Sequence, residues 1–248
     1  MKKIFIFAVF IGLFGTICAQ ETLQQANEAY TQGDFARAVE GYQQTLAEKG
    51  ASAEVYYNLG NCYYRLNQIA PAILNYERAL LLDPGDGDIR FNLEIARLKT
   101  VDKIEPAGEF FLTTGYNAVK NLCSADSWSH IGIACFLLLL AALALFLFSR
   151  KIALKKIGFY TGMIFLVLTI FANLFAYSQK QKLIDRNTAI IFAPTVTIKS
   201  APDASGTDLF ILHEGTKVRI KSQLGEWQEI ETADGNVGWI PSQDMEVI

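Results

Sequence analysis

The side chains that most often carry out catalysis or bind metals are sparse in this sequence. It contains two histidines, His130 and His213, which lie in segments of different composition. Its four cysteines follow neither the spacing of a disulfide framework nor that of a zinc site. Patterns typical of phosphate loops, dinucleotide folds, nucleophile elbows and zinc proteases do not occur. We therefore expect no catalytic residues, no metal and no cofactor, and we expect that the chain is not an enzyme.

The other side chains that could recognise a ligand are asparagine, tyrosine and arginine residues that recur in the N-terminal part of the chain. A shift of 34 residues aligns identical residues, namely Asn27 with Asn61, Tyr30 with Tyr64, Ala38 with Ala72 and Tyr42 with Tyr76. A period of this length predicts stacked helix–turn–helix units. Pairs of helices are therefore the elements expected to position these side chains.

The best copy of the repeat spans residues 53–84 and resembles the tetratricopeptide repeat. The matching positions are Tyr56, Leu59, Gly60 and Tyr63 in its first helix, Ala72, Tyr76 and Ala79 in its second, and Pro84 at its end. Gly60 and Ala72 are small where the helices cross, and we expect Tyr56 and Tyr63 to fill the space beside them. A weaker copy occupies residues 22–50, and residues 88–99 add a helix that we expect to cap the stack. The whole repeat region is predicted to span residues 20–103.

Tetratricopeptide stacks present a concave face from their first helices, and this face binds peptides in many members. Here it is expected to carry a set of polar and aromatic candidates for peptide binding, namely Asn27, Tyr57, Asn61, Tyr64, Arg65 and Asn92. Tyr57 and Tyr64 point away from Tyr56 and Tyr63 on one helix, which favours a ligand-contacting surface over packing. Leu23 and Asp88 stand where a clamp for C-terminal carboxylates needs lysine, which argues against such a clamp.

Two uncharged apolar runs follow, at residues 131–148 and 157–177. At ~1.5 Å per residue, each is about long enough to cross a hydrocarbon core of ~30 Å. Two such runs in succession favour a transmembrane hairpin over the core of a soluble helical protein. The linker between them, residues 149–156, contains no acidic residue and four basic ones, namely Arg150, Lys151, Lys155 and Lys156. The positive-inside tendency predicts that this loop is cytoplasmic.

The segments before the hairpin predict export of the N-terminal part. Residues 1–19 resemble a secretory signal peptide, with Lys2 and Lys3 ahead of an apolar stretch and cleavage expected after Ala19, although an uncleaved anchor is an alternative. Residues 104–130 are an amphipathic linker. We interpret it as a helix near the outer membrane–water boundary with Trp128 as an interfacial anchor, or as a linker helix packed on the repeats.

Residues 178–248 contain short β-rich runs separated by Gly, Pro, Asn and Asp, which predicts five or six strands in a small barrel. The positions of Val196, Pro202, the residues 213–216, Trp227 and the residues 238–240 resemble those of a bacterial SH3-like domain. Such a resemblance implies binding of cell-wall peptides or of other proteins. Trp227 is the candidate for its ligand surface, with a core position as the slightly favoured alternative. Trp239 is expected in the core.

The expected fold class is a multidomain membrane protein of all-α tetratricopeptide repeats, a two-helix transmembrane hairpin and a small all-β SH3-like barrel. This order of parts, with the sequence RFNLE at residues 90–94, resembles the tetratricopeptide-containing proteins of the Bacteroides aerotolerance (Bat) family, the BatE type in particular. The resemblance implies a component of the bacterial inner membrane, with both soluble domains periplasmic. It also implies partners, namely von Willebrand factor A-type Bat membrane proteins and a MoxR-type ATPase, in an envelope complex linked to stress tolerance.

Three functions are compatible with the sequence. The first is a scaffold that binds protein partners and lies in the lipid bilayer. The second is a peptidoglycan-binding protein that acts through the SH3-like domain. The third, an enzyme, would need an active site between domains that no motif in the sequence indicates. Nucleic acid is not an expected partner, because a net charge of −3 and a pI near 5.5 provide no basic surface.

Overall fold

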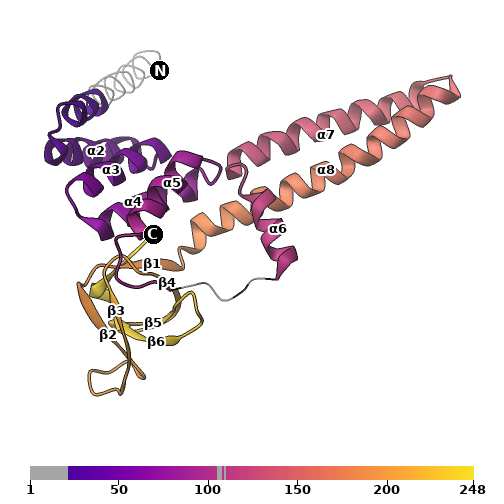
Figure 1. Ribbon diagram of the computed structural model, residues 1–248. Coiled ribbons are helices and arrows are strands. Elements are labelled where there is room, and N and C mark those ends of the chain that lie inside the picture. The colour runs from indigo at the N-terminus through magenta and orange to yellow at the C-terminus, as the bar shows by residue number, and fades with distance from the viewer. Residues whose placement is uncertain (1–21, 105–107, 109) are drawn as a thin grey trace, which may run out of the picture. The chain divides into compact units, whose positions relative to one another are not determined.

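The computed structural model describes residues 22–104, 108 and 110–248, so the predicted signal peptide lies outside the described residues. The chain divides into two compact units (Figure 1). One, called here the repeat–β unit, contains residues up to Leu80 together with 86–108 and 187–248. The other, called the hairpin unit, contains residues 81–85 and 109–186.

Helices make up the first part of the repeat–β unit. Residues 22–31 are helical, and they are followed by α2 (Phe35–Lys49), α3 (Ala53–Arg65), α4 (Ile69–Leu82) and α5 (Gly87–Arg97). Side-chain oxygens of Asp34, Ser52 and Asp86 accept hydrogen bonds from backbone amides in the first turns of α2, α3 and α5. Such N-caps satisfy amides that have no partner within the helix. The predicted helical repeats are confirmed.

Small residues and tyrosines form the core between the repeat helices. Ala26, Ala38, Tyr42 and Cys62 are almost completely buried there. A Cβ added at Gly60 would lie 2.7 Å from Cδ1 of Tyr76, so the ring of Tyr76 fills the space at the helix crossing. The expected role of Tyr56 and Tyr63 beside Gly60 is only partly seen. Tyr76 is the ring that covers Gly60, while Tyr63 is half-buried against the core cluster and Tyr56 is half-buried.

The second part of the repeat–β unit, called here the β-domain, is a seven-stranded antiparallel sheet. Its strands are β1 (Thr188–Ile191), β2 (Thr195–Lys199), β3 (Asp208–His213), β4 (Lys217–Leu224), β5 (Trp227–Glu231), β6 (Val237–Pro241) and β7 (Met245–Val247). They are arranged in the order β3-β2-β6-β5-β4-β1-β7. The predicted all-β domain is confirmed, but β3 was missed. Its apolar residues Leu209 and Ile211 are 49% and 53% exposed, so both faces are apolar and the usual polar alternation is hidden.

The core of the β-domain consists of aliphatic side chains rather than tryptophan. Its buried residues are Ala189, Ile191, Val196, Ile198, Leu212, Val218, Ile230, Ile240 and Met245. Trp227 and Trp239 are half-buried and do not belong to this cluster. The expectation of a core position for them was therefore wrong. On β6 the inward positions are taken by Gly238 and Ile240, which leaves Trp239 on the outer face.

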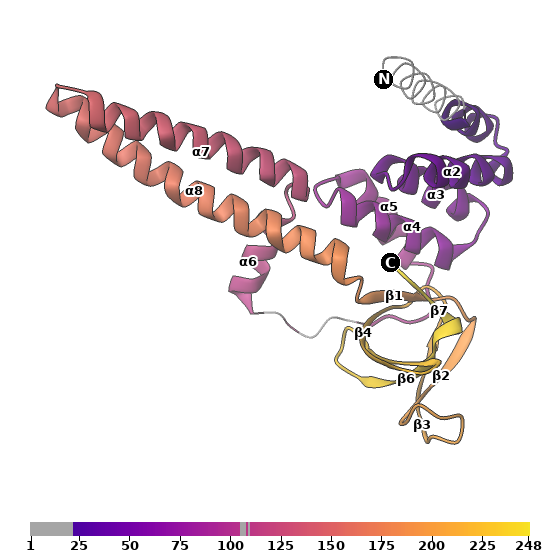
Figure 2. The same ribbon diagram turned by 180° about the vertical axis from the view of Figure 1, so that it is seen from behind.

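The hairpin unit contains α6 (Phe111–Lys120) and two long apolar helices, α7 (Ala125–Phe148) and α8 (Ile152–Asp185). The long helices lie side by side and antiparallel (Figure 2). Gly158 permits this close packing, because a Cβ there would lie 2.8 Å from the carbonyl oxygen of Ala142. Both helices are long and apolar enough to span a membrane. Each extends beyond the run predicted from sequence, and only residues 149–151 separate them.

Candidate peptide-binding groove

A groove of about 370 Å³ lies on the face of the repeats where the candidate residues were expected. It is lined by Tyr30, Tyr57, Asn61, Tyr64, Arg65, Tyr76, Asn92 and Ile95. Five of the six candidate residues from the sequence are among them. The sixth, Asn27, does not line the groove.

Helical spacing explains why these residues converge. Residues 57, 61, 64 and 65 occupy positions i, i+4, i+7 and i+8 of α3 and therefore share one face. Asn92 and Ile95 are three residues apart on α5 and form the opposite wall. Tyr30 and Tyr76 come from residues 22–31 and from α4, so four helices contribute to the groove.

A chain of hydrogen bonds connects three of these helices along the groove. The hydroxyl of Tyr76 on α4 donates to Oδ1 of Asn61 on α3 at 2.7 Å. Nδ2 of Asn92 on α5 donates to the same Oδ1 at 3.2 Å and to the hydroxyl oxygen of Tyr57 at 2.8 Å. The amide of Asn61 is therefore held in one orientation by two donors.

The same tyrosine–asparagine bond occurs in the preceding repeat. There the hydroxyl of Tyr42 donates to Oδ1 of Asn27 at 2.7 Å, and the two residues are again 15 positions apart. Burial raises the pKa of both tyrosines, Tyr42 and Tyr76, with smaller contributions from neighbouring groups. Both hydroxyls therefore remain neutral donors at physiological pH. Asn27, which was a binding candidate, serves to connect its own two helices.

Two cationic side chains at the groove lie over aromatic rings, Lys99 over the groove residue Tyr64 and Arg65 over Phe35 outside it. Nζ of Lys99 is 4.3 Å from the ring centroid of Tyr64, and the guanidinium carbon of Arg65 is 5.8 Å from that of Phe35. Arg65 is exposed. These contacts are in the range of cation–π interactions, and they give this side of the groove a positive charge.

Sequence reasoning did not select Tyr30, Tyr76 and Ile95 for this groove. Two of them carried a usable signal, because Tyr30 aligns with Tyr64 at the 34-residue shift and Ile95 shares a helix face with Asn92. Tyr76 was noted only as a match to the repeat pattern. Its ring covers Gly60 and its hydroxyl reaches Asn61.

A second, smaller groove of about 270 Å³ lies elsewhere in the same unit. It is lined by Gln43, Leu46, Tyr56, Leu59, Tyr63, Pro71, Leu74, Asn75, Arg78, Phe192 and Glu246. The hydroxyl of Tyr63 accepts a hydrogen bond from Nε2 of Gln43 at 2.9 Å. The tyrosines that were expected inside the stack therefore face this second groove, which the repeat helices and the β-domain form together.

The candidate ligand residue of the β-domain, Trp227, lies on its outer surface at the start of β5. Its register partners are Leu224 on β4 and Pro241 on β6. Trp239, two residues from Pro241, faces Glu229 on β5 and Lys199 on β2. Both tryptophans thus lie on one face of neighbouring strands, in diagonal positions.

The four basic residues that are expected to set the membrane topology are exposed at one end of the hairpin unit. Arg150 and Lys151 lie between the long helices, whereas Lys155 and Lys156 belong to α8. At the other end, the carbonyl oxygen of Lys120 accepts hydrogen bonds from Nε1 of Trp128 at 2.8 Å and from Nε2 of Gln179 at 3.0 Å. These bonds fix α6 on the long helices.

Across residues 22–104, 108 and 110–248, no three His, Cys, Asp or Glu side chains are grouped as metal ligands. The charged groups that lie close together form ion pairs instead. Glu77 contacts Arg97 and Lys217, and Asp102 contacts His213. These ion pairs join helices and strands of the repeat–β unit.

Two family models match parts of this chain. Residues 53–86 match the tetratricopeptide repeat, and residues 194–246 match the bacterial SH3 domain. The first range contains α3 and α4, and the second contains most of the β-domain. Both families are interaction modules that are typically non-catalytic. No curated protein matches the chain.

Several solved structures are similar to this chain. The TPR domain of Arabidopsis OM64 is 18% identical with a TM-score of 0.33, over 59% of this chain and 96% of that one. The Yersinia enterocolitica chaperone SycD, in complex with a peptide of the translocator YopD, is 14% identical with a TM-score of 0.30, over 61% and 92%. MamA is 16% identical with a TM-score of 0.33, over 67% and 94%.

Proposed function

We propose that this chain is a non-enzymatic, membrane-anchored scaffold that binds a peptide segment of a protein partner in the groove of its repeats. The observation that carries this proposal is the groove of about 370 Å³ in which side chains of four helices converge. Protein–protein binding is the activity expected of tetratricopeptide repeats. The groove gives that general expectation a specific location.

The chemistry of the groove suits an extended peptide. Such a segment carries backbone carbonyls and amides, and the groove offers the amide of Asn61, the hydroxyl of Tyr57 and the guanidinium of Arg65. The ring of Tyr64 adds an aromatic surface for a side chain of the ligand. Tyrosine and arginine are enriched among residues that dominate binding energies. The hydrogen bonds among Asn61, Asn92 and Tyr57 hold these groups in place before the ligand arrives.

The hairpin unit is the proposed membrane anchor. We assign α7 and α8 to two spans of the bacterial inner membrane, with the basic residues 149–156 in the cytoplasm and the repeats and the β-domain in the periplasm. The support is the length and apolar character of both helices, together with the basic residues where they meet. Residues 104–130, which include α6, then lie at the periplasmic membrane surface.

The resemblance to Bat proteins of the BatE type extends this proposal to partners. It supports a place in an envelope complex with von Willebrand factor A-type membrane proteins and a MoxR-type ATPase, in which the groove binds one component. A role in stress tolerance would then belong to the complex. In that complex, this chain would contribute the binding surfaces of its repeats and its β-domain.

Photo-crosslinking in intact cells tests the proposal. A photoreactive amino acid at position 64, inside the groove, should capture a protein partner that mass spectrometry identifies. The matched control carries it at position 44, because Gln44 is exposed on α2 and does not line the groove. Crosslinks at position 44 alone, or equal crosslinks at both positions, would contradict binding in the groove.

Binding of cell-wall peptides by the β-domain is the second candidate function. It is favoured by the match of residues 194–246 to the bacterial SH3 domain and by the position of the half-buried Trp227 on the outer face of the sheet. Co-sedimentation of the detergent-solubilised protein with purified peptidoglycan tests it. Loss of co-sedimentation in Trp227→Ala, but not in Leu224→Ala on the neighbouring strand, would support this function over scaffolding.

A further inference from the structure

The last helix of the repeats, α5, has no second helix to complete its unit. It has 11 residues, and a helix of that length is marginal in water unless tertiary contacts hold it. Its inner face buries Ile89, Leu93 and Ala96, while Asn92 and Ile95 reach the peptide groove. Whatever fixes α5 therefore also fixes one wall of the groove.

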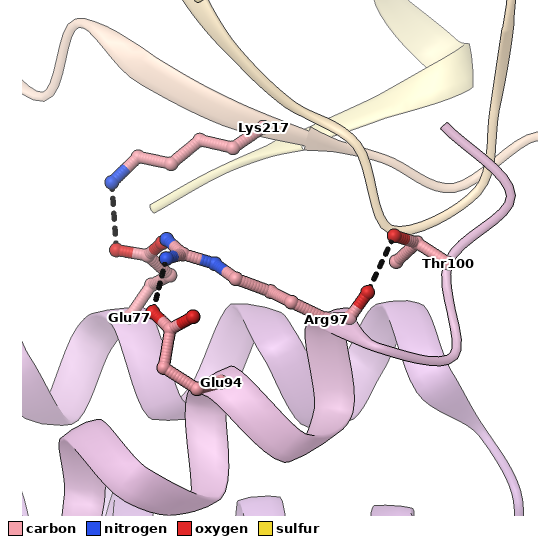
Figure 3. A network of polar contacts seen from close by, with 5 residues as sticks. All are labelled: Glu77, Glu94, Arg97, Thr100 and Lys217. Carbon is pink, nitrogen blue, oxygen red and sulfur yellow. Dashed lines mark hydrogen bonds and ion pairs between the residues drawn. The ribbon is translucent and has the colours of Figure 1, made fainter. Parts of the chain in front are cut away.

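A buried carboxylate ties α5 to the β-domain (Figure 3). The side chain of Glu77, on α4, is only 7% exposed. Its Oε1 accepts a hydrogen bond from Arg97 at the end of α5, and its Oε2 accepts one from Nζ of Lys217 on β4 at 2.7 Å. Burial by itself would raise the pKa of Glu77, but the charges of Lys217 and Arg97 and their hydrogen bonds hold it below its usual value. The carboxylate is thus ionised and joins three elements.

A second carboxylate ties the segment that follows α5 to the turn between β3 and β4. Oδ2 of Asp102 accepts hydrogen bonds from the backbone amide of His213 and from the hydroxyl of Thr216, both at 2.7 Å. Its Oδ1 lies 2.8 Å from Nδ1 of His213. Thr100 closes the end of α5 by donating to the carbonyl oxygen of Arg97 at 2.8 Å.

The tip of that turn packs directly on the repeats. Gly215 has a φ of +84°, and a Cβ at this position would lie 2.7 Å from Cγ2 of Thr100 and 3.1 Å from Cδ1 of Ile73. Ile73 belongs to α4 and is completely buried. The turn therefore covers apolar surface that a further repeat helix covers in a longer stack.

From these contacts we infer that the β-domain is the C-terminal cap of the repeat stack, and that it controls peptide binding by holding α5 in the position the groove requires. This inference rests on the proposed function of the groove. If a peptide binds only when α5 is in place, then a docked β-domain favours binding and a bound peptide favours docking. Couplings of this kind usually change an affinity about 5- to 150-fold.

The test uses the full chain in lipid nanodiscs and compares Lys217→Met with Lys221→Met. Both lysines lie on β4 with side-chain exposures of 38% and 44%, but Lys221 forms its ion pair with Glu231 on the neighbouring strand β5 and not with the repeats. Hydrogen exchange reports the protection of residues 89–97, and a peptide selected from a random phage library on the wild-type protein reports the groove. Asn61→Ala verifies that the selected peptide binds there.

Lys217→Met should accelerate exchange in residues 89–97 and 213–217 and should weaken peptide binding about fivefold or more. Lys221→Met should behave as the wild type. Asp102→Asn breaks a second polar contact of the β-domain with the repeats and should produce the same pair of changes if the β-domain acts as a cap. Unchanged exchange in both Lys217→Met and Asp102→Asn would overturn the inference, as would faster exchange with unchanged affinity. If the library yields no peptide that depends on Asn61, the proposed function fails, and the exchange rates alone decide whether the β-domain caps the stack.

Discussion

Nζ of Lys217 lies 2.7 Å from Oε2 of Glu77, although the two residues are 140 positions apart in the chain. Between them in sequence lie α5, the linker and the whole transmembrane hairpin predicted here. The contact means that the β-domain returns to the repeats after the long helices. The pair, in which Glu77 is buried and Lys217 is half-exposed, joins the repeats and the β-domain within one compact unit.

Replacing the buried carboxylate should destabilise the repeat–β unit. In Glu77→Gln the two cations lose their shared negative partner, and we expect the free energy of unfolding to fall by about 1–3 kcal/mol. The loss stays below that of a fully buried pair because Arg97 and Lys217 keep 39% and 38% of their side chains exposed. Chemical denaturation measures it. Glu94→Gln is the matched control, since Glu94 also pairs with Arg97 but is 62% exposed, and it should change stability by about 0.5 kcal/mol or less.

Docking of the β-domain should weaken in acid. Burial alone would raise the pKa of both Glu77 and Asp102. Ion pairs and hydrogen bonds have the larger combined effect and lower the pKa of each carboxyl. For Asp102 these hydrogen bonds come from Thr216 and His213. A carboxylate whose folded pKa is depressed stabilises the fold above its unfolded pKa, and this contribution is lost as the pH falls through the folded value.

Ordinary carboxyl pKa values of about 4 place the onset of that loss near pH 4.5. Hydrogen exchange of residues 213–217 at a series of pH values, corrected for intrinsic rates, measures it. The double variant Glu77→Gln, Asp102→Asn should show a flatter pH dependence between pH 3 and pH 5. A profile as steep as that of the wild type would assign the acid transition to other groups.

The hydrogen bonds in the groove should contribute to the stability of the repeats. Asn61→Ala removes the acceptor of the nearly buried Tyr76 hydroxyl and of the Asn92 amide, and we expect a loss of about 1–3 kcal/mol. Asn58→Ala on the same helix is the control, because Asn58 does not line the groove. Thermal unfolding followed by circular dichroism compares the stability of the two variants. Equal shifts would mean that the Tyr76–Asn61 bond contributes no more than an ordinary helix-surface position.

Sequence alone was sufficient for the parts of the groove that obey a local period. Asn61, Tyr64 and Arg65 follow from the helical spacing of α3 within a 34-residue repeat. Local periods contain no information on how one helix meets a strand far away in the chain. The contact between Glu77 and Lys217 could therefore not be predicted from the sequence, although both residues are charged and of opposite sign.

The prediction of core positions for the tryptophans of the β-domain was wrong for a different reason. A large aromatic residue in a small domain suggests a core position, but the burial of Trp239 depends on which face of β6 points inward. Gly238 and Ile240 fill the inner face, where a Cβ at position 238 would lie 2.4 Å from Cγ2 of Ile198. One residue of register decides the outcome, because successive strand residues alternate between faces.

The orientation of the hairpin can be tested with single cysteines in a background whose native cysteines are replaced. Ala153, near the start of α8, and Ala204, in the loop between β2 and β3, are both exposed, so burial does not limit either site. The proposed topology places Ala153 in the cytoplasm and Ala204 in the periplasm. In intact cells with a permeable outer membrane, a charged thiol reagent should therefore label Ala204→Cys strongly and leave Ala153→Cys unlabelled until the inner membrane is opened. Labelling of Ala153→Cys in intact cells would reverse the proposed orientation, and equal labelling of both would indicate that α7 and α8 do not span the membrane.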